Sequence, residues 1–333
     1  MNIYDVSERA NVSIATVSRV LNGNPNVSEK TRARVLAVMD EIGYTPNVFA
    51  RSLGLDTMRT IGIMCADSSD PWLAEAIYHL EQELRRNGYD SILCCSGYQP
   101  DTKKNYFELL RSKRVDAIIL AGSHYMEPKS RDNAYLTEAA RKLPLMLVNG
   151  FLDVPGIYST VCDDRAAVKM AVTKLIRSGR TSVLYLYAGN SYSNLQKLAG
   201  YQEAYASQGL PVKEELIRFC PKDLDATEQL LCSLKESGIS FDAVMAAEDI
   251  MAVGTVKYAH RTGIRIPEDL NIIGYNNSIL SRCTDPELTT IDNKVESLCT
   301  TTASTLMKVL EGGNVPARTT ITAELITRGT TNF

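Results

Sequence analysis

The segment "VSIATVSRVLNG", residues 12–23, offers one arginine, several hydroxyls and an asparagine, and two apolar side chains, Ile14 and Ala15, stand near its start. An arginine makes paired hydrogen bonds to a guanine edge, apolar groups contact thymine methyls, and hydroxyls or amides donate to phosphates. Arg19, Ala15 and Ile14 are therefore candidates for base contacts. The candidates for phosphate contacts are Ser13, Thr16, Ser18 and Asn22.

A helical wheel at about 100° per residue separates this segment into two faces. Ala15 and Arg19 lie on the face away from the apolar side, and Ile14 lies on the border. The apolar side consists of Val17, Val20 and Leu21. The short "ANVS" turn joins two helices, and the second helix presents a face that no apolar core covers. This arrangement is typical of a helix-turn-helix whose second helix enters a DNA major groove. The alternative is a three-helix packing module with a solvated Arg19.

Capping signals place three short helices in the first sixty residues. Asn2 with Asp5 predicts the start of a first helix, and Ser13 and Ser28 predict the starts of the second and third. In the third helix, apolar residues recur at helical spacing from residue 35 to residue 42, and Gly43 predicts its end.

The pattern changes at Thr60. Short apolar runs such as "TIGIMCAD", "DAIILAGS" and "PLMLVNG" alternate with longer amphipathic segments, and the rhythm restarts with "TVCDD", "SVLYLYAG" and "DAVMAAED". Near-continuous apolar strands separated by helices indicate parallel sheets that are covered on both faces. Two such sets predict two doubly wound subdomains after an all-α N-terminal module.

Several motifs that would signal catalysis or a cofactor are missing from the sequence. There is no G-x-G-x-x-G after a strand and no G-x-x-x-x-G-K-[ST], and the eight cysteines contain no C-x-x-C pair that could join the three histidines in a zinc site. We therefore expect no cofactor, no metal and no enzymatic activity. Ligands of open α/β sheets lie beyond the carboxyl ends of the strands, so this edge is expected to form a binding cleft.

Composition excludes few other classes. The 333 residues carry a net charge of −3, with a slight excess of Lys and Arg in the first sixty, which alone does not establish a nucleic-acid partner. No N-terminal signal segment and no apolar run of membrane-spanning length occur, so a cytoplasmic protein is expected.

The fifty residues from "YDVSERANVSIATVSRVLNG" to "GYTPNVFARSL" resemble the DNA-binding headpiece of the LacI/GalR family of bacterial transcription regulators. Further motifs, including "RTIGIM", "LAGYQEA", "EDIMAVG", "IPEDLNIIGYNN" and "ELITRGT", resemble the periplasmic-binding-protein-like core of that family. The resemblance implies a headpiece at residues 1–46 and a hinge helix with linker at 47–59. It implies a core N-subdomain of residues 60–160 with 293–321, and a C-subdomain of residues 161–292 with 322–333.

The resemblance also implies roles for single residues. It places Ile14, Ala15 and Arg19 at base-reading positions, and makes "NVFARSL" a hinge helix in the operator minor groove. Leu53 would be the wedge that opens the central base step, which agrees with the kinks that inserted apolar side chains produce in DNA.

The cleft implied by the resemblance contains Asp67, Trp72, Asn149, Lys197, Glu248, Asn276 and Asn293. Here the sequence departs from sugar-binding relatives. Asn149 and Asn276 stand where aspartates are common, and Lys197 stands where an arginine is usual. A lysine does not offer the planar fork of a guanidinium.

Two readings of this cleft stay open. In the first, a small polar molecule such as a sugar or sugar phosphate is held by the amides and Lys197, with Trp72 as an apolar wall. In the second, the cleft has no small effector, or a partner protein regulates the core.

The resemblance implies a repressor that binds a pseudo-palindromic operator as a homodimer. The chain ends at "RGTTNF" without a leucine-heptad helix, so a dimer rather than a tetramer is expected. The rival from another class is a solute-binding protein of a transport system, which shares the two-subdomain core. The headpiece and the missing signal segment disfavour it.

Overall fold

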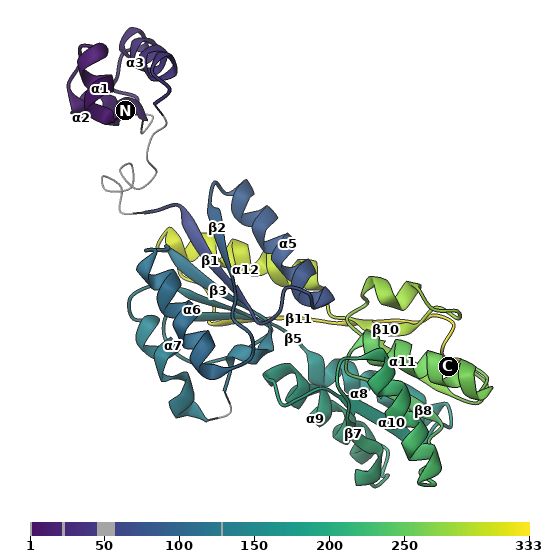
Figure 1. Ribbon diagram of the computed structural model, residues 1–333. Helices are drawn as coiled ribbons and strands as arrows, with labels where there is room; N and C mark the ends of the chain where they lie inside the picture. The colour runs from purple at the N-terminus through teal and green to yellow at the C-terminus, as the bar shows by residue number, and fades with distance from the viewer. Residues whose placement is uncertain (1, 22–23, 45–56, 128) are drawn as a thin grey trace. The chain divides into compact units, whose positions relative to one another are not determined.

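The computed structural model describes residues 2–21, 24–44, 57–127 and 129–333 (Figure 1). The chain divides near residue 60 into two compact units. Because the placement of one unit relative to the other is not determined, each is described by itself.

The N-terminal unit contains three helices, which are α1 (Ile3–Arg9), α2 (Ile14–Leu21) and α3 (Glu29–Glu41). The predicted caps are confirmed. Asn2 and Asp5 form a reciprocal capping box on α1, Ser28 caps α3, and Gly43 follows α3 with a positive φ of 61°. Each cap satisfies backbone groups that the first or last helical turn leaves unpaired.

The three helices share one small core. Its buried members are Val6, Ala10, Val17, Val20, Val35, Met39 and Ile42. Leu36 shares the apolar spacing of α3, but its side chain is 50% exposed and lies outside this core. A spacing pattern predicts only an apolar stripe, and the partner helices of such a small unit cover only part of it.

The second unit contains two six-stranded sheets. The first sheet has the strand order β11-β5-β4-β3-β1-β2. Its strands are β1 (Thr60–Cys65), β2 (Asp90–Cys95), β3 (Ala117–Ala121), β4 (Leu145–Val148), β5 (Ile157–Cys162) and β11 (Arg318–Ile321). Pairing is parallel from β11 through to β1.

The second sheet has the order β12-β10-β9-β8-β6-β7. Its strands are β6 (Val183–Tyr187), β7 (Ile217–Phe219), β8 (Ala243–Ala246), β9 (Asn271–Tyr275), β10 (Thr289–Asp292) and β12 (Glu324–Ile326). Its pairings are parallel except at the edge, where β12 runs antiparallel to β10. The expected class, a helical N-terminal module followed by two doubly wound α/β subdomains, is confirmed.

One strand lies in a different sheet from the one that the sequence pattern predicts. The run "TVCDD" was expected to open the second set, but its first residues end β5, which pairs with β4 and β11 in the first sheet. Strand β5 therefore crosses residue 160, where the predicted boundary lies. An apolar run shows that a strand is buried but not which sheet it joins.

Helices cover both faces of each sheet. Those beside the first sheet are α5 (Pro71–Arg86), α6 (Pro100–Ser112), α7 (Ala134–Ala139) and α12 (Val295–Leu310). Figure 1 shows α5 and α12 on one side of this sheet and α6 and α7 on the other. Those beside the second sheet are α8 (Asp164–Arg177), α9 (Tyr192–Ser207), α10 (Leu224–Glu236) and α11 (Asp249–Thr262). Here α8 packs against α9, and α10 packs against α11.

Short 3₁₀ turns complete the unit. They are η1 (Ser123–Tyr125), η2 (Ser130–Asn133), η3 (Glu214–Leu216) and η4 (Ile279–Arg282). None of the helices in the described ranges combines the length and apolar character needed to cross a bilayer.

The chain passes between the two sheets three times, after β5, after β10 and after β11. Each subdomain is consequently built from separate stretches of sequence and has its own apolar core. The strand ends of both sheets lead into the site described next.

Candidate functional site

Helix α2 presents the face that the wheel predicted. Val17 and Val20 are buried, whereas Ala15 and Arg19 are exposed. Ile14 is 39% exposed, in keeping with its border position. The polar face is therefore free of the headpiece core and open to a partner.

The start of α2 is held by side chains. The backbone N–H of Thr16 donates to Ser13 Oγ at 3.2 Å, and the two hydroxyl oxygens lie 2.9 Å apart. Ser13 is exposed, while Thr16 and Ser18 are half-buried. Asn22 and Leu53, with the whole "NVFARSL" segment, lie outside the described residues.

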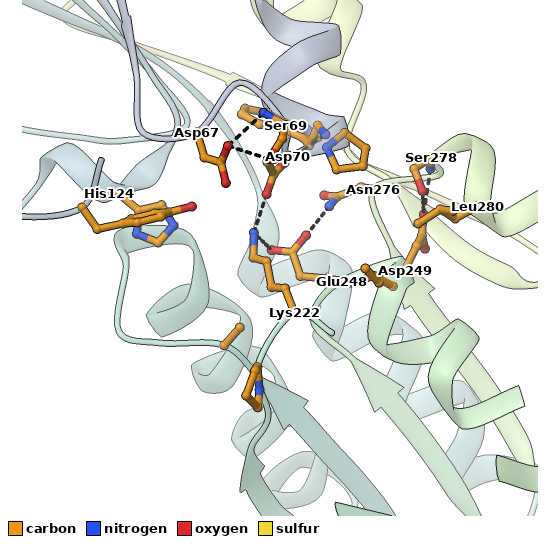
Figure 2. Close-up of a pocket in the computed structure, with 16 residues that line it drawn as sticks. Asp67, Ser69, Asp70, His124, Lys222, Glu248, Asp249, Asn276, Ser278 and Leu280 are labelled. Atoms are coloured by element: carbon orange, nitrogen blue, oxygen red, sulfur yellow. Dashed lines mark hydrogen bonds and ion pairs between the residues drawn. The ribbon is translucent and has the colours of Figure 1, made fainter. Parts of the chain in front are cut away.

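In the second unit, a cavity of about 420 Å³ opens between the two subdomains (Figure 2). A smaller cavity of about 40 Å³ adjoins it and shares part of its lining. All seven cleft residues expected from the sequence line one or both cavities. They are Asp67, Trp72, Asn149, Lys197, Glu248, Asn276 and Asn293.

These residues meet because six of them follow a strand or begin a helix at the same edge, and Lys197 lies in the second turn of α9. Asp67 follows β1, Glu248 follows β8 and Asn276 follows β9. Asn149 and Asn276 adopt positive φ angles of 59° and 103°. Asparagine tolerates this backbone region better than most non-glycine residues.

A chain of side-chain hydrogen bonds crosses the cleft. Trp72 Nε1 donates to Asn293 Oδ1 at 3.1 Å, and Asn293 Nδ2 donates to Asn276 Oδ1 at 3.0 Å. Asn276 Nδ2 in turn donates to Glu248 Oε2 at 2.5 Å. Asn293, together with Asn276, which stands where an aspartate is common, thus links Trp72, at the start of α5, to the second subdomain.

Lys222 completes this chain, and the sequence analysis did not identify it. Its Nζ lies 2.8 Å from Asp70 Oδ2 and 3.1 Å from Glu248 Oε1 (Figure 2). Asp70 also caps α5 by accepting from the N–H groups of Trp72 and Leu73. Lys222 lies just beyond β7, so the rule that ligands bind at strand ends could have found it.

Charge interactions in the cleft are strong because its groups are largely withdrawn from water. Burial opposes ionisation of Glu248, yet the ammonium groups of Lys222 and Lys197 hold its pKa below the usual value. Burial likewise disfavours charge on Lys222, but Glu248 and Asp70 raise its pKa above the usual value. Lys222, Glu248 and Asp70 therefore form a charged triad that spans both subdomains.

The pKa of Asp249 is shifted upward, in contrast to that of Glu248. Burial raises its pKa to about 6, although it accepts hydrogen bonds from Thr290 Oγ1 and from Ser278 N and Oγ.

Asp67 shows the opposite shift. It accepts hydrogen bonds from the Ser69 hydroxyl and N–H, which lower its pKa.

Lys197 is already engaged by the protein. It is 3% exposed, its Nζ donates to the Ala247 carbonyl at 2.9 Å, and the same atom lies 3.7 Å from the centre of the Tyr275 ring. Lys197 lines only the smaller cavity, whereas Lys222 lines both.

His124 and Tyr98 form part of the wall, and the sequence analysis also missed them. Their rings meet edge to face with centroids 5.0 Å apart. Burial, and then the nearby Lys222 charge, lower the pKa of His124 to about 4. The cleft thus presents a neutral imidazole, aromatic walls and more carboxylates than cations, an arrangement suited to binding polar groups.

A headpiece with an exposed second helix, joined in one chain to two α/β subdomains around a polar cleft, defines a DNA-binding transcription regulator with a ligand-binding-type core. Comparison with family models agrees. Residues 2–47 match the bacterial regulatory proteins of the lacI family, and residues 58–329 match the periplasmic binding proteins and sugar binding domain of the LacI family. The chain belongs to the LacI family.

Relatives cover the whole chain. It is 61% identical over 333 residues, all of both chains, to an HTH-type transcriptional regulator of Lachnoclostridium phytofermentans. It is 30% identical to the regulator GalR of Escherichia coli, with 98% of this chain and 94% of GalR aligned.

A solved structure of the Lac repressor dimer, bound to operator and the anti-inducer ONPF, has the same fold. The two chains superpose with a TM-score of 0.90 over 99% of each, at 24% sequence identity.

The neutral state of His124 predicts a pH dependence of stability. Its folded pKa of about 4 lies below the ordinary value of 6.5, so the unfolded chain binds more protons between these values. The His124 contribution to stability is complete above pH 6.5 and is lost as the pH falls toward 4. Asp249, with its pKa raised to about 6, acts in the opposite direction over the same range.

We expect His124→Asn to reduce the fall in unfolding free energy between pH 7 and pH 5, measured by urea denaturation. Asp249→Asn removes the opposing contribution and should make that fall steeper. Identical pH profiles for the wild type and His124→Asn would contradict the assignment.

Proposed function

We propose that this regulator is a repressor that binds a pseudo-palindromic operator as a homodimer in the cytoplasm, and that it has no catalytic activity. The observation that carries the DNA-binding mode is the exposed face of α2, where Ala15 and Arg19 lie opposite the buried Val17 and Val20. A second helix of this kind places its exposed side chains against base edges in the major groove.

The roles proposed for Ser13, Ile14, Ala15, Thr16, Ser18 and Arg19 rest on this placement. Those of Asn22 and Leu53, which lie outside the described residues, rest on the family resemblance. Ile14, Ala15 and Arg19 read bases, and the polar residues Ser13, Thr16, Ser18 and Asn22 contact phosphates. A hinge segment within residues 47–59 inserts Leu53 into the minor groove. The other proposed boundaries are a headpiece at 1–46, an N-subdomain of 60–160 with 293–321, which β5 extends to Cys162, and a C-subdomain that accordingly begins after Cys162 and runs to 292, with 322–333.

The cleft binds a small polar effector that changes operator affinity. A cavity of about 420 Å³ lined by Trp72, Tyr98 and several carboxylates supports an uncharged ligand with many hydroxyls, such as a sugar. Lys222, the cation in the described lining of the larger cavity, is already paired with Asp70 and Glu248. Lys197, in the smaller cavity, donates to the Ala247 carbonyl, so neither lysine is left open to a phosphate group. We therefore favour a neutral sugar over a sugar phosphate.

One observation favours the alternative, a regulator that needs a partner protein or no effector. The cleft closes on its own polar groups, through Lys222 and Asp70 and through Ser123 and Ser191, whose Oγ atoms lie 2.9 Å apart. A ligand must then replace bonds that the protein already makes, which reduces the net gain on binding.

Two measurements test the proposal on the full chain. Selection from a random DNA pool should yield a palindrome, which also tests dimeric binding. Titration calorimetry with neutral sugars and their phosphates should then find a ligand that shifts affinity for the selected DNA. Absence of any such ligand, with intact DNA binding, would support the alternative.

The base-reading role of Arg19 has a specific signature. Arg19→Ala should cost about 1–3 kcal/mol at one base position and relax the choice of base there. The measurement is binding to the selected site and to its single-base variants. As a control, Arg9→Ala removes an exposed arginine of α1 that pairs with Glu41, and should leave base preference unchanged. Uniform weakening on every site would make Arg19 a phosphate contact instead.

The charged triad should hold the subdomains together. Lys222→Met leaves Asp70 and Glu248 without their cation, and the Lys222 side chain is only 29% exposed, so we expect a loss of roughly 1–3 kcal/mol in unfolding free energy. Lys257→Met, which breaks an exposed pair with Asp225, is the matched control and should change stability little. Adding Glu248→Gln to Lys222→Met should recover part of the loss. Unchanged stability in the single variant would refute the bridging role.

A further inference from the structure

Two thiols meet at the end of adjacent strands, beside the cleft but outside its lining. Cys65 is the last residue of β1, Cys95 is the last residue of β2, and these strands are neighbours in the first sheet. The two Sγ atoms lie 3.6 Å apart. Disulfide sulfurs are about 2.05 Å apart, so a modest rotation about each Cα–Cβ bond would bring the thiols to bonding distance.

The surrounding backbone holds the pair in place. Ser96 N donates to the Cys65 carbonyl at 2.8 Å, and Gly97 N donates to the Ala66 carbonyl at 2.9 Å. The Ser96 hydroxyl lies 2.9 Å from the hydroxyl of the buried Tyr125. The contact between the sulfurs is thus fixed by the sheet and by its neighbouring loops.

The two thiols differ in access to solvent. Cys95 is exposed and Cys65 is completely buried. Burial, and then the Cys95 thiol beside it, raise the pKa of Cys65 to about 12. An oxidant in solution therefore meets Cys95 first, and Cys65 is placed as the second thiol.

The other six cysteines are differently placed. Cys94 precedes Cys95 in β2, and side chains alternate between the two faces along a strand. Cys94, Cys162 and Cys299 are buried, and the exposed Cys283 donates its thiol to the Ile279 carbonyl. Cys220 lies against the Thr227 hydroxyl, and Cys232 accepts from Arg261. Across the described residues, sulfur-to-sulfur contact is found for Cys65 with Cys95.

We propose that Cys65 and Cys95 form a redox-responsive dithiol that hydroperoxides convert to a disulfide. The Cys95 thiolate attacks the peroxide O–O bond, which gives a Cys95 sulfenic acid and releases an alcohol, or water from hydrogen peroxide. The Cys65 thiol, losing its proton, then attacks the sulfenic sulfur, and one water leaves as the S–S bond forms. Both cysteine sulfurs are oxidised, and one peroxide is reduced by two electrons.

Closure of this bond would act on the cleft. Asp67 lies two residues beyond Cys65, and Tyr98 lies three residues beyond Cys95, and both line the larger cavity. A disulfide would tie the two loops that carry these side chains and restrict their movement. The dithiol assignment stands whether or not the cleft binds an effector.

The test uses the full-length protein. The reduced protein is exposed to equimolar hydrogen peroxide, unfolded in the presence of an alkylating maleimide, and weighed by mass spectrometry. Of its eight free cysteines, two should escape alkylation, and peptide mapping should find them joined as Cys65–Cys95. A thiol reductant should restore all eight.

Variants separate this result from general oxidation. Cys95→Ser should keep its seven thiols at the same peroxide dose. Cys283→Ser removes another exposed cysteine and should still form the disulfide. Cys65→Ala should accumulate a Cys95 sulfenic acid that dimedone traps.

Thermal unfolding gives a second readout. The oxidised wild type should differ in melting temperature from its reduced form, and Cys95→Ser should show no such shift. The proposal is overturned if all eight thiols survive, if another pair is joined, or if Cys95 is oxidised without linking to Cys65.

Discussion

Parallel strand pairing is the constraint on which the cleft depends. In each sheet it brings the carboxyl ends of the strands to one edge, and three chain passages keep the two edges close together. Side chains that are far apart in sequence then meet. Asp70 and Lys222, separated by 152 positions, form an ion pair there. If the strands were antiparallel, the polar residues that follow them would lie at opposite edges of the sheet and would not form one cleft.

The charged triad also shows how this cleft manages buried charge. A lysine beside one carboxylate would leave part of its hydrogen-bonding capacity unused, whereas Lys222 meets both Asp70 and Glu248. Asn276 supplies Glu248 with a further donor. Because the two acids come from different subdomains, the interaction that neutralises the lysine also links the subdomains. Electrostatic balance and the relative position of the subdomains are therefore coupled.

The structure of the headpiece depends mainly on interactions that are local in sequence. Its caps and its small apolar core come from local sequence, and these leave one face of α2 free. Ile14 lies at the junction, partly against the core and partly exposed. An apolar side chain suits both environments, the headpiece core and a thymine methyl. Contact with DNA decides whether Ile14 packs on the core or reads a base.

The sequence by itself determined the helix caps, the order of strands and helices, and the family, because capping, periodicity and the long headpiece motif are local properties. It also placed seven residues in the cleft through the family resemblance, which agrees with the rule that polar residues after parallel strands share an edge. It did not assign β5 to the first sheet, because an apolar run does not specify its neighbours. Three contacts are visible only in the tertiary structure. Lys222 pairs with acids of both subdomains, Lys197 lies over the Tyr275 ring, and Cys65 contacts Cys95. Those contacts depend on distances between segments remote in sequence, which no local pattern encodes.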